Sequence, residues 1–230
     1  MLPSASVTFD LDITPDNPTI TGGYDYPALA QCLDYIIPMA YDMVGRSVAA
    51  NAPLPAIVDG VVRQYKALGI KPGRLVVALP WYAYDFTCDT TLDIPTTDQP
   101  HPTSTPTPTP TPTCDLPPGG HNANWETVHK TFGYGEVLDL HAASGAPPIM
   151  FNATTVTKWF DYLNTTTKQR HRVYFDDPET LLTKYTTLLK LGVAGVGSWT
   201  IDAVHRTDAA DTAATAKAMW AAVASALPPS

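Results

Sequence analysis

The chain has 230 residues, 44% of them hydrophobic, which is enough to bury a core in one domain or two. Its net charge is −8, and its 14 Lys and Arg residues are spread singly along the sequence. Because phosphate recognition needs clustered cations, nucleic acid and anionic membranes are excluded as partners. No apolar run is long enough to cross a bilayer, so the sequence predicts no membrane span.

Four segments are predicted to be buried parallel strands, since each is a short apolar or β-branched run bounded by Gly, Pro or Asp. They are residues 6–13, 34–42, 74–86 and 192–202. None of them alternates cleanly between apolar and polar residues, as expected for strands that are covered on both faces.

Helical patterns follow these strands at residues 54–68, 178–191 and 209–227. The second begins at Pro178 and ends before Gly192, which are typical start and stop residues. Strands that alternate with helices indicate an α/β fold with a parallel sheet. The predicted organisation has four parts: barrel strands in 1–87, a Pro/Thr-rich insertion in 88–118, a small α+β insertion in 119–171, and the last strand with its helices in 172–230.

Several features are typical of a secreted or lysosomal protein, although the first residues do not resemble a signal peptide. Asn152 and Asn164 begin glycosylation sequons, and the Pro-Thr run 102–113 has the composition of an O-glycosylated polyproline stretch. Cys88 and Cys114 flank this run, and we expect them to form a disulfide. The third cysteine, Cys32, is then left over.

Aromatic and acidic residues gather where the predicted strands end. The first strand carries Asp12 at its end, and the second carries Tyr41-Asp42. The third carries Trp81, Tyr82, Tyr84 and Asp85, and the fourth carries Trp199 and Asp202. Ligands bind at this carboxyl edge in α/β sheets, and aromatic faces beside carboxylates suit a sugar. For one strand, interior packing would explain such aromatics better; for three together, a binding site does. The histidines show no metal-ligand spacing, so we expect no metal and no cofactor.

The segments "IIPMAYD", "RLVVALPWYAYDFTC", "AANAP" and "VYFDDPETLLTKYTTLLKLGVAGVGSWTID" resemble family 18 glycoside hydrolases, in particular their di-N-acetylchitobiase branch. The resemblance covers most of the chain outside the Pro-Thr run. It implies strands five to eight of a (β/α)8 TIM barrel and hydrolysis of β-1,4-linked N-acetylglucosamine. In this family the N-acetyl oxygen of the substrate attacks the anomeric carbon, with retention of configuration.

The resemblance also implies roles for individual residues. Tyr41 would donate a hydrogen bond to the N-acetyl carbonyl, and Asp42 would bind and orient the same sugar. Trp199 would be the surface on which that sugar stacks. Met39 would line the subsite, and Trp81 and Tyr82 would lie near it.

One family motif is absent from this sequence. The family places its general acid at the end of D-x-x-D-x-D-x-E on strand four, and no such string occurs here. The interval from Asp12 to Met39 has room for a single strand-helix-strand step, so the first strand corresponds to strand five of the barrel. We therefore expect strands one to four to be missing and the chain alone to be inactive.

Three explanations follow from this prediction. The chain is a fragment of a longer glycosidase, which needs the missing N-terminal half barrel or a second chain. Alternatively, it is a sugar-binding pseudoenzyme similar to a chitinase-like lectin, or an O-glycosylated structural protein.

Overall fold

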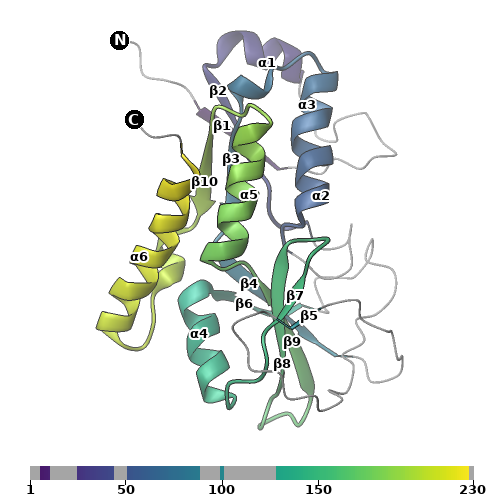
Figure 1. Cartoon of the computed structure of the whole chain (residues 1–230). Coiled ribbons are helices and arrows are strands. Elements are labelled where there is room, and N and C mark those ends of the chain that lie inside the picture. The colour runs from purple at the N-terminus through teal and green to yellow at the C-terminus, as the bar shows by residue number, and fades with distance from the viewer. Residues whose placement is uncertain (1–5, 11–24, 44–50, 89–98, 101–127, 228–230) are drawn as a thin grey trace.

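The structure, a computed structural model, describes residues 6–10, 25–43, 51–88, 99–100 and 128–227. These residues form two sheets with helices packed against them (Figure 1). The first sheet is parallel, and its strands have the order β1-β2-β3-β10. They are β1 (Ser6–Asp10), β2 (Tyr35–Met39), β3 (Val76–Pro80) and β10 (Gly195–Trp199). Over the described strands this sheet is open and does not close into a barrel.

Helical segments lie between or after the parallel strands, and those within 54–68, 178–191 and 209–227 confirm the predicted helices. They are α1 (Tyr26–Cys32), the run α2 (Leu54–Ile57), η1 (Val58–Arg63) and α3 (Gln64–Ala67), then η2 (Pro72–Arg74), α5 (Pro178–Lys190), η4 (Ile201–Val204) and α6 (Ala209–Ala226). In Figure 1, α5 crosses the parallel sheet between α6 and the α2–α3 run. No helix in the part of the chain that the structure describes is both long enough and apolar enough to span a bilayer.

Helix α5 shows why these residues adopt this structure. The Asp177 carboxylate caps its first turn by accepting hydrogen bonds from two backbone N–H groups, and Pro178 occupies the first helical position. Leucine and tyrosine at helical spacing bury one face, and Gly192 with φ +87° follows the helix end. Both predicted boundaries of this helix are confirmed.

The second sheet is antiparallel, with the strand order β5-β7-β8-β9-β4-β6. Its members are β5 (Gln99–Pro100), β7 (Met150–Asn152), β8 (Thr157–Leu163), β9 (Arg170–Phe175), β4 (Tyr82–Thr87) and β6 (Val128–Gly133), with α4 (Tyr134–Ala143) beside them. The prediction of one strand over 74–86 is wrong, because β3 lies in the parallel sheet and β4 in the antiparallel sheet. The antiparallel sheet consequently extends past the predicted insertion 119–171 at both ends.

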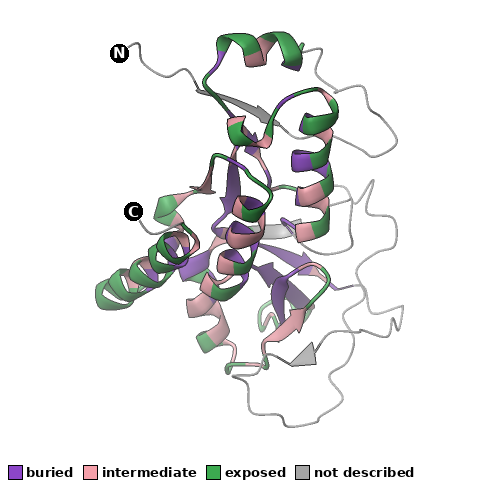
Figure 2. Cartoon of the chain, turned by 45° about the horizontal axis from the view of Figure 1, so that its top comes forward, coloured by how far each residue is buried: buried purple, intermediate pink, exposed green. Residues whose placement is uncertain are grey.

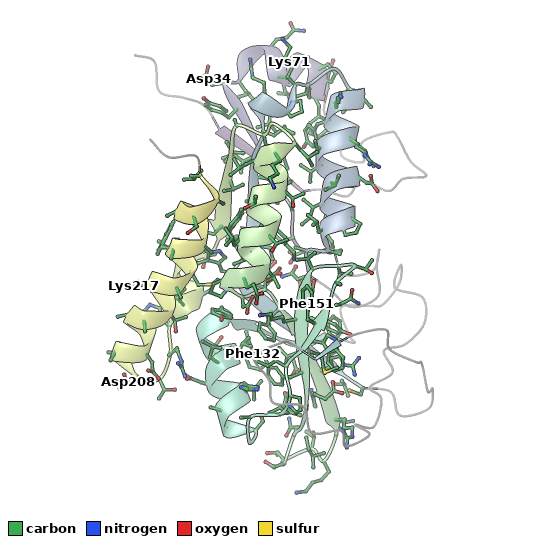
Figure 3. All side chains as sticks on the ribbon, in the orientation of Figure 1. Asp34, Lys71, Phe132, Phe151, Asp208 and Lys217 are labelled. Atoms are coloured by element: carbon green, nitrogen blue, oxygen red, sulfur yellow. The ribbon has the colours of Figure 1, made fainter. Side chains whose placement is uncertain are left out.

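Trp81 connects β3 to β4 and lies where the two sheets meet. Its N–H donates to the carbonyl of Trp199 at 2.8 Å, and its own carbonyl accepts from the N–H of Tyr134 at 3.0 Å. Its side chain is buried. Most residues of the strands around it are buried as well (Figure 2), and side chains of the helices and strands fill the space between these elements (Figure 3). One hydrophobic core therefore runs from the parallel sheet into the antiparallel one.

Among the described residues, two ion pairs formed by Lys or Arg have both members buried. The Lys184 ammonium contacts both carboxylate oxygens of Asp176 at 2.6 and 2.7 Å. The Arg172 guanidinium donates two hydrogen bonds to Asp161 and lies 3.6 Å above the ring of Trp159. A buried charge is unfavourable without a partner, and in each pair the two opposite charges stabilise each other.

Candidate functional site

The candidate site lies where strands of both sheets end or begin. Tyr41 and Asp42 follow β2, Trp199 ends β10, and Tyr82 begins β4. The parallel register pairs Met39 with Ala78, and the N–H of Ala40 still donates to the Ala78 carbonyl at 2.9 Å. Chain segments far apart in the sequence therefore meet at one carboxyl edge, as the sequence predicted.

Three aromatic rings form the centre of this site. The rings of Tyr41 and Trp199 stack at 6.3 Å with an interplanar angle of 20°, and Tyr82 meets Tyr41 edge to face at 6.1 Å. Trp199 is 55% exposed even with this contact. An indole that retains this much exposed surface beside two phenols can stack on the apolar face of a sugar.

The Asp42 carboxylate is anchored by two phenols. It accepts hydrogen bonds from the hydroxyls of Tyr82 and Tyr84. Burial raises the pKa of both tyrosines above the ordinary value, and the hydrogen bonds to Asp42 raise it further. Both hydroxyls therefore remain protonated donors at physiological pH and hold the Asp42 carboxylate in a fixed place.

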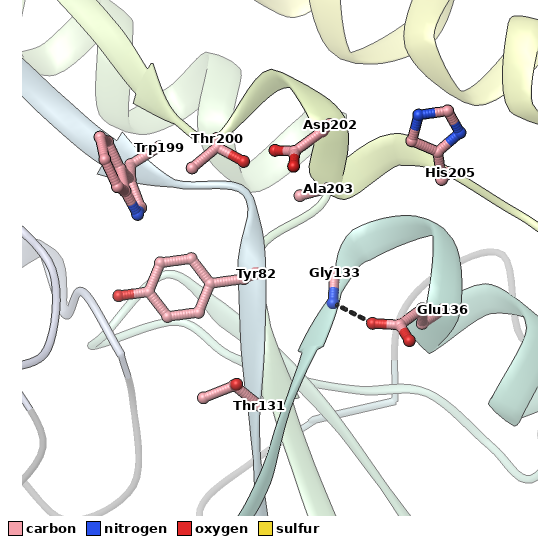
Figure 4. Close-up of a pocket in the computed structure, with 9 residues that line it drawn as sticks. All are labelled: Tyr82, Thr131, Gly133, Glu136, Trp199, Thr200, Asp202, Ala203 and His205. Carbon is pink, nitrogen blue, oxygen red and sulfur yellow. Dashed lines mark hydrogen bonds between the residues drawn. The ribbon is translucent and has the colours of Figure 1, made fainter.

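A pocket of about 370 Å³ opens beside Trp199 and Tyr82 (Figure 4). Its lining is partly aromatic, partly polar and partly backbone: Tyr82, Thr131, Gly133, Glu136, Trp199, Thr200, Asp202, Ala203 and His205. In Figure 4, Trp199 and Tyr82 face the pocket from one side, and Glu136, Asp202 and His205 lie on the other. This size and mixture of residues suit a small polar ligand with one apolar face. Among the described residues, no three His, Cys, Asp or Glu side chains gather in a way that could hold a metal ion.

The structure brings four of the six predicted site residues together, and two of these four, Tyr82 and Trp199, line the pocket. Tyr41, Asp42, Tyr82 and Trp199 form one connected group. Met39 is half-buried in β2 and is not part of the lining. Trp81 is 1% exposed, and its indole N–H donates to the hydroxyl of Tyr185 at 3.0 Å. In this structure Trp81 therefore contributes to core packing and does not reach the pocket.

The sequence placed Tyr84, the second anchor of Asp42, at the carboxyl edge but gave it no role, and it did not predict one wall of the pocket. Tyr84 is two residues from Tyr82 on the same strand, and this spacing alone puts both on one face. No spacing or motif in the sequence indicates that Thr131, Glu136 and His205 form a wall of the pocket. It depends on the fold of the insertion and on how α4 packs against η4, which sequence periodicity does not specify.

The predicted modification sites are only partly within the described residues. Asn152 and Asn164 each accept two backbone N–H groups in the turns that flank β8. Cys88 is buried at the end of β4, while its predicted partner Cys114 and the Pro-Thr run lie outside the described residues. Cys32 is a free, exposed thiol. Glycosylation and the Cys88–Cys114 disulfide therefore remain predictions.

The chain belongs to the glycosyl hydrolases family 18, whose sequence profile matches residues 6–203. Within this family it is similar to the di-N-acetylchitobiases. It is 26% identical to the di-N-acetylchitobiase of Mus musculus over 224 residues, which are 95% of this chain and 56% of that protein. The chain thus spans about half the length of the curated relatives it matches.

Solved structures show the same fold. A chitinase from Chromobacterium violaceum superimposes with a TM-score of 0.65 at 18% identity, over 99% of this chain and 56% of that one. A plant class V chitinase mutant from Cycas revoluta, in complex with (GlcNAc)3, superimposes with a TM-score of 0.60 at 16% identity, over 94% of this chain and 54% of that one. These likenesses place the chain in an α/β fold of the TIM-barrel type.

Proposed function

We propose that this chain is the sugar-binding C-terminal part of a glycosidase that hydrolyses β-1,4-linked N-acetylglucosamine. The observation that carries the proposal is the connected group of Tyr41, Asp42, Tyr82 and Trp199 beside an open pocket. Trp199 supplies an exposed stacking face, Tyr41 a phenol donor, and Asp42 a carboxylate acceptor. Membership of family 18 and the similarity to di-N-acetylchitobiases favour chitobiose or chitin oligosaccharides as the substrate.

In the proposed reaction the N-acetyl oxygen of the bound sugar attacks the anomeric carbon while the glycosidic bond breaks. Tyr41 donates a hydrogen bond to the N-acetyl group and holds it for the attack, and Asp42 orients the same group. The leaving oxygen must take a proton from a general acid, which the D-x-x-D-x-D-x-E motif supplies in the family and which this sequence lacks. Loss of general-acid catalysis typically lowers a rate by about 10²–10⁴-fold. We infer that the chain alone is inactive and that strands one to four of a barrel, on the same or another polypeptide, complete the enzyme.

Sugar binding is tested by titrating N,N′-diacetylchitobiose while following tryptophan fluorescence. We expect the wild-type signal to saturate and Trp199→Ala to lose the response. Trp220→Ala is the matched control, because Trp220 is 48% exposed on α6 and is not part of the pocket lining. A wild-type chain that gives no response, or a response that survives Trp199→Ala, would contradict the proposal.

A second candidate, a chitin-oligosaccharide-binding pseudoenzyme, is favoured by the same stacking surface in a sequence that lacks the acid motif. The two candidates make different predictions for the genomic sequence immediately upstream of Met1. An in-frame D-x-x-D-x-D-x-E there supports the glycosidase. A stop codon with no such exon supports the pseudoenzyme.

We also propose that the protein passes through the secretory pathway. Asn152 and Asn164 lie in turns between antiparallel strands, and the Thr154 and Thr166 of their sequons are exposed. Expression in a secreting eukaryotic cell should give a product whose mass falls on treatment with an N-glycosidase. Replacement of both asparagines by Gln should abolish that change in mass, and an untreated wild type of unmodified mass would refute the proposal.

A further inference from the structure

Asn51 lies behind the candidate site and uses its whole side chain to bind backbone there. Its Oδ1 accepts the N–H of Asp42 at 2.7 Å, and its Nδ2 donates to the carbonyl of Tyr82 at 3.3 Å. The residue is 2% exposed, so these bonds replace water that the amide would otherwise bind. One buried amide thus connects the end of β2 to the start of β4.

The residue that Asn51 contacts has an unusual backbone conformation. Asp42 has φ 56°, in the left-handed region that side chains with a Cβ disfavour. In this conformation the Asp42 carboxylate accepts hydrogen bonds from the Tyr82 and Tyr84 hydroxyls. The hydrogen bond from the Asp42 N–H to Asn51 stabilises this conformation directly.

Asn51 is in turn held in place by buried contacts of the next residue. The carbonyl of Ala52 accepts a hydrogen bond from the Lys184 ammonium at 2.7 Å. Lys184 reaches this position from the buried face of α5 and is itself paired with Asp176. The chain therefore cannot shift at Asn51 without disturbing a buried ion pair.

Closing the chain between Met43 and Asn51 does not explain the side chain. The carbonyl of Asn51 accepts the N–H of Met43 at 2.9 Å, and any residue could supply that bond. The amide contributes two additional bonds, to Asp42 and to Tyr82, both of which belong to the candidate site. Making both bonds requires an acceptor and a donor on one short side chain, and asparagine provides both.

We propose that Asn51 is a positioning residue that holds Asp42 in its left-handed conformation, with the carboxylate in place for the sugar. Asn51 acts on the sugar through Asp42, while its bond to the Tyr82 carbonyl holds the amide itself in place. The expected effect of Asn51 on sugar binding rests on the proposed function. The expected effect of Asn51 on the conformation of Asp42 is independent of any ligand. The two effects are therefore measured separately.

The first measurement is hydrogen exchange of the Asp42 amide by NMR in the full chain. Removing one hydrogen-bond partner should accelerate local exchange by about tenfold. We expect this acceleration in Asn51→Ala and much less in Asn51→Asp, which keeps the acceptor. Asn164→Ala is the matched control, because Asn164 also accepts backbone N–H groups but lies in a distant turn. If Asn51→Ala does not fold, Asn51→Ser, which is too short to reach Asp42, takes its place. Unchanged exchange at Asp42 would overturn the proposal.

The second measurement is a double-mutant cycle on the affinity for N,N′-diacetylchitobiose. Asn51→Ala should weaken binding by about tenfold in the wild-type background and have little effect in the Asp42→Ala background. Equal losses in both backgrounds would mean that Asn51 does not act through Asp42, and would overturn the proposal. If the wild-type chain binds no sugar, the proposed function is wrong. The exchange rate of the Asp42 amide then tests by itself whether Asn51 holds Asp42 in its conformation.

Discussion

Gly135 lies at the start of α4, where this helix packs directly against the segment that follows β10. A Cβ at this position would lie 2.1 Å from the carbonyl oxygen of His205 and 2.6 Å from that of Val204. Both contacts are with backbone, which cannot rotate away as a side chain can. The close approach brings Glu136 and His205 to the same pocket wall, so the glycine is part of the architecture of the site.

We therefore expect Gly135→Ala to lower the free energy of unfolding by about 1–3 kcal/mol, or to prevent folding. Urea denaturation followed by fluorescence measures this change. Gly197→Ala is the control, since no atom lies within 4 Å of a Cβ built there. That control should stay within about 0.5 kcal/mol of the wild type. Equal stability of the two variants would show that α4 does not pack as described.

Asp139 joins α4 to the same segment through its carboxylate. It accepts hydrogen bonds from the backbone N–H and hydroxyl of Thr207 and pairs with the Arg206 guanidinium. The Thr207 backbone N–H, and then Arg206, hold the pKa of this carboxyl below its ordinary value of 3.8. Because the folded state favours the ionised form, the stabilisation is fully present above pH 3.8 and is lost as the pH falls through the lower folded value.

Asp139→Asn should consequently lower the Tm at pH 7, and the difference from the wild type should shrink as the pH falls below 3.8. Thermal unfolding at a series of pH values measures both effects. Asp59→Asn, which removes an exposed ion pair with Arg63 on η1, is the control and should change the Tm little. A Tm difference that stays constant down to pH 2 would contradict this assignment.

At the scale of elements, helix α5 carries a charge on its buried face. Burial lowers the pKa of the Lys184 ammonium and raises that of the Asp176 carboxyl, and their mutual attraction opposes both shifts. Lys184 also binds the Ala52 carbonyl, so the pair connects α5 to the segment that precedes α2. Removing one member would leave the other charge buried without a partner.

Lys184→Met should therefore cost about 3–5 kcal/mol of unfolding free energy. The double variant Lys184→Met/Asp176→Leu should recover most of that loss, because replacing a buried pair by apolar residues is often neutral. Chemical denaturation of the single and double variants gives both values. A double variant as unstable as the single would show that the bond to Ala52 contributes more than the ion pair.

The same helix shows what the sequence could and could not predict. Its boundaries at Pro178 and Gly192, and the burial of Leu181 and Leu188, follow from local signals. The burial of Lys184 does not, because its partner eight residues earlier precedes the helix and helical periodicity counts a lysine as exposed. Periodicity reports local geometry and carries no information on the partners of a buried polar group.

Strands β3 and β4 show the same limit at the site. The apolar run 74–86 indicated strand structure correctly but not the change of pairing partner at Trp81, since parallel and antiparallel strands can have the same composition. The resemblance to family 18 implies that Trp81 and Tyr82 both lie near the subsite. Alternation along a strand separates neighbours, and only Tyr82 faces the pocket.

At the scale of the whole molecule, one core serves both sheets. Buried residues of β3, β8 and β9 belong to a single cluster with those of α5. A smaller second cluster lies on the antiparallel sheet alone and consists of Tyr84, Phe86, Cys88, Trp159 and Tyr174. The parallel sheet ends in β1 and β10, whose outer edges have no partner among the described strands. Such edges pair readily with another chain, which agrees with the proposal that further strands complete the fold.

A shared core predicts cooperative unfolding. Denaturation of the chain followed by tryptophan fluorescence and by far-ultraviolet circular dichroism should give coincident transitions. Two separated transitions would mean that one sheet unfolds without the other.

The hydrogen bonds of Trp81 have a consequence for how a ligand is received. Its backbone joins β3 to β4, and its N–H and carbonyl are bound to Trp199 and Tyr134. Rotation of one sheet against the other would break these bonds, so they hold the backbone at Trp199 and at the start of β4 in a fixed relation before any ligand arrives. On the proposed function, a sugar would meet a preformed site, and little of its binding free energy would be spent on closing the protein around it.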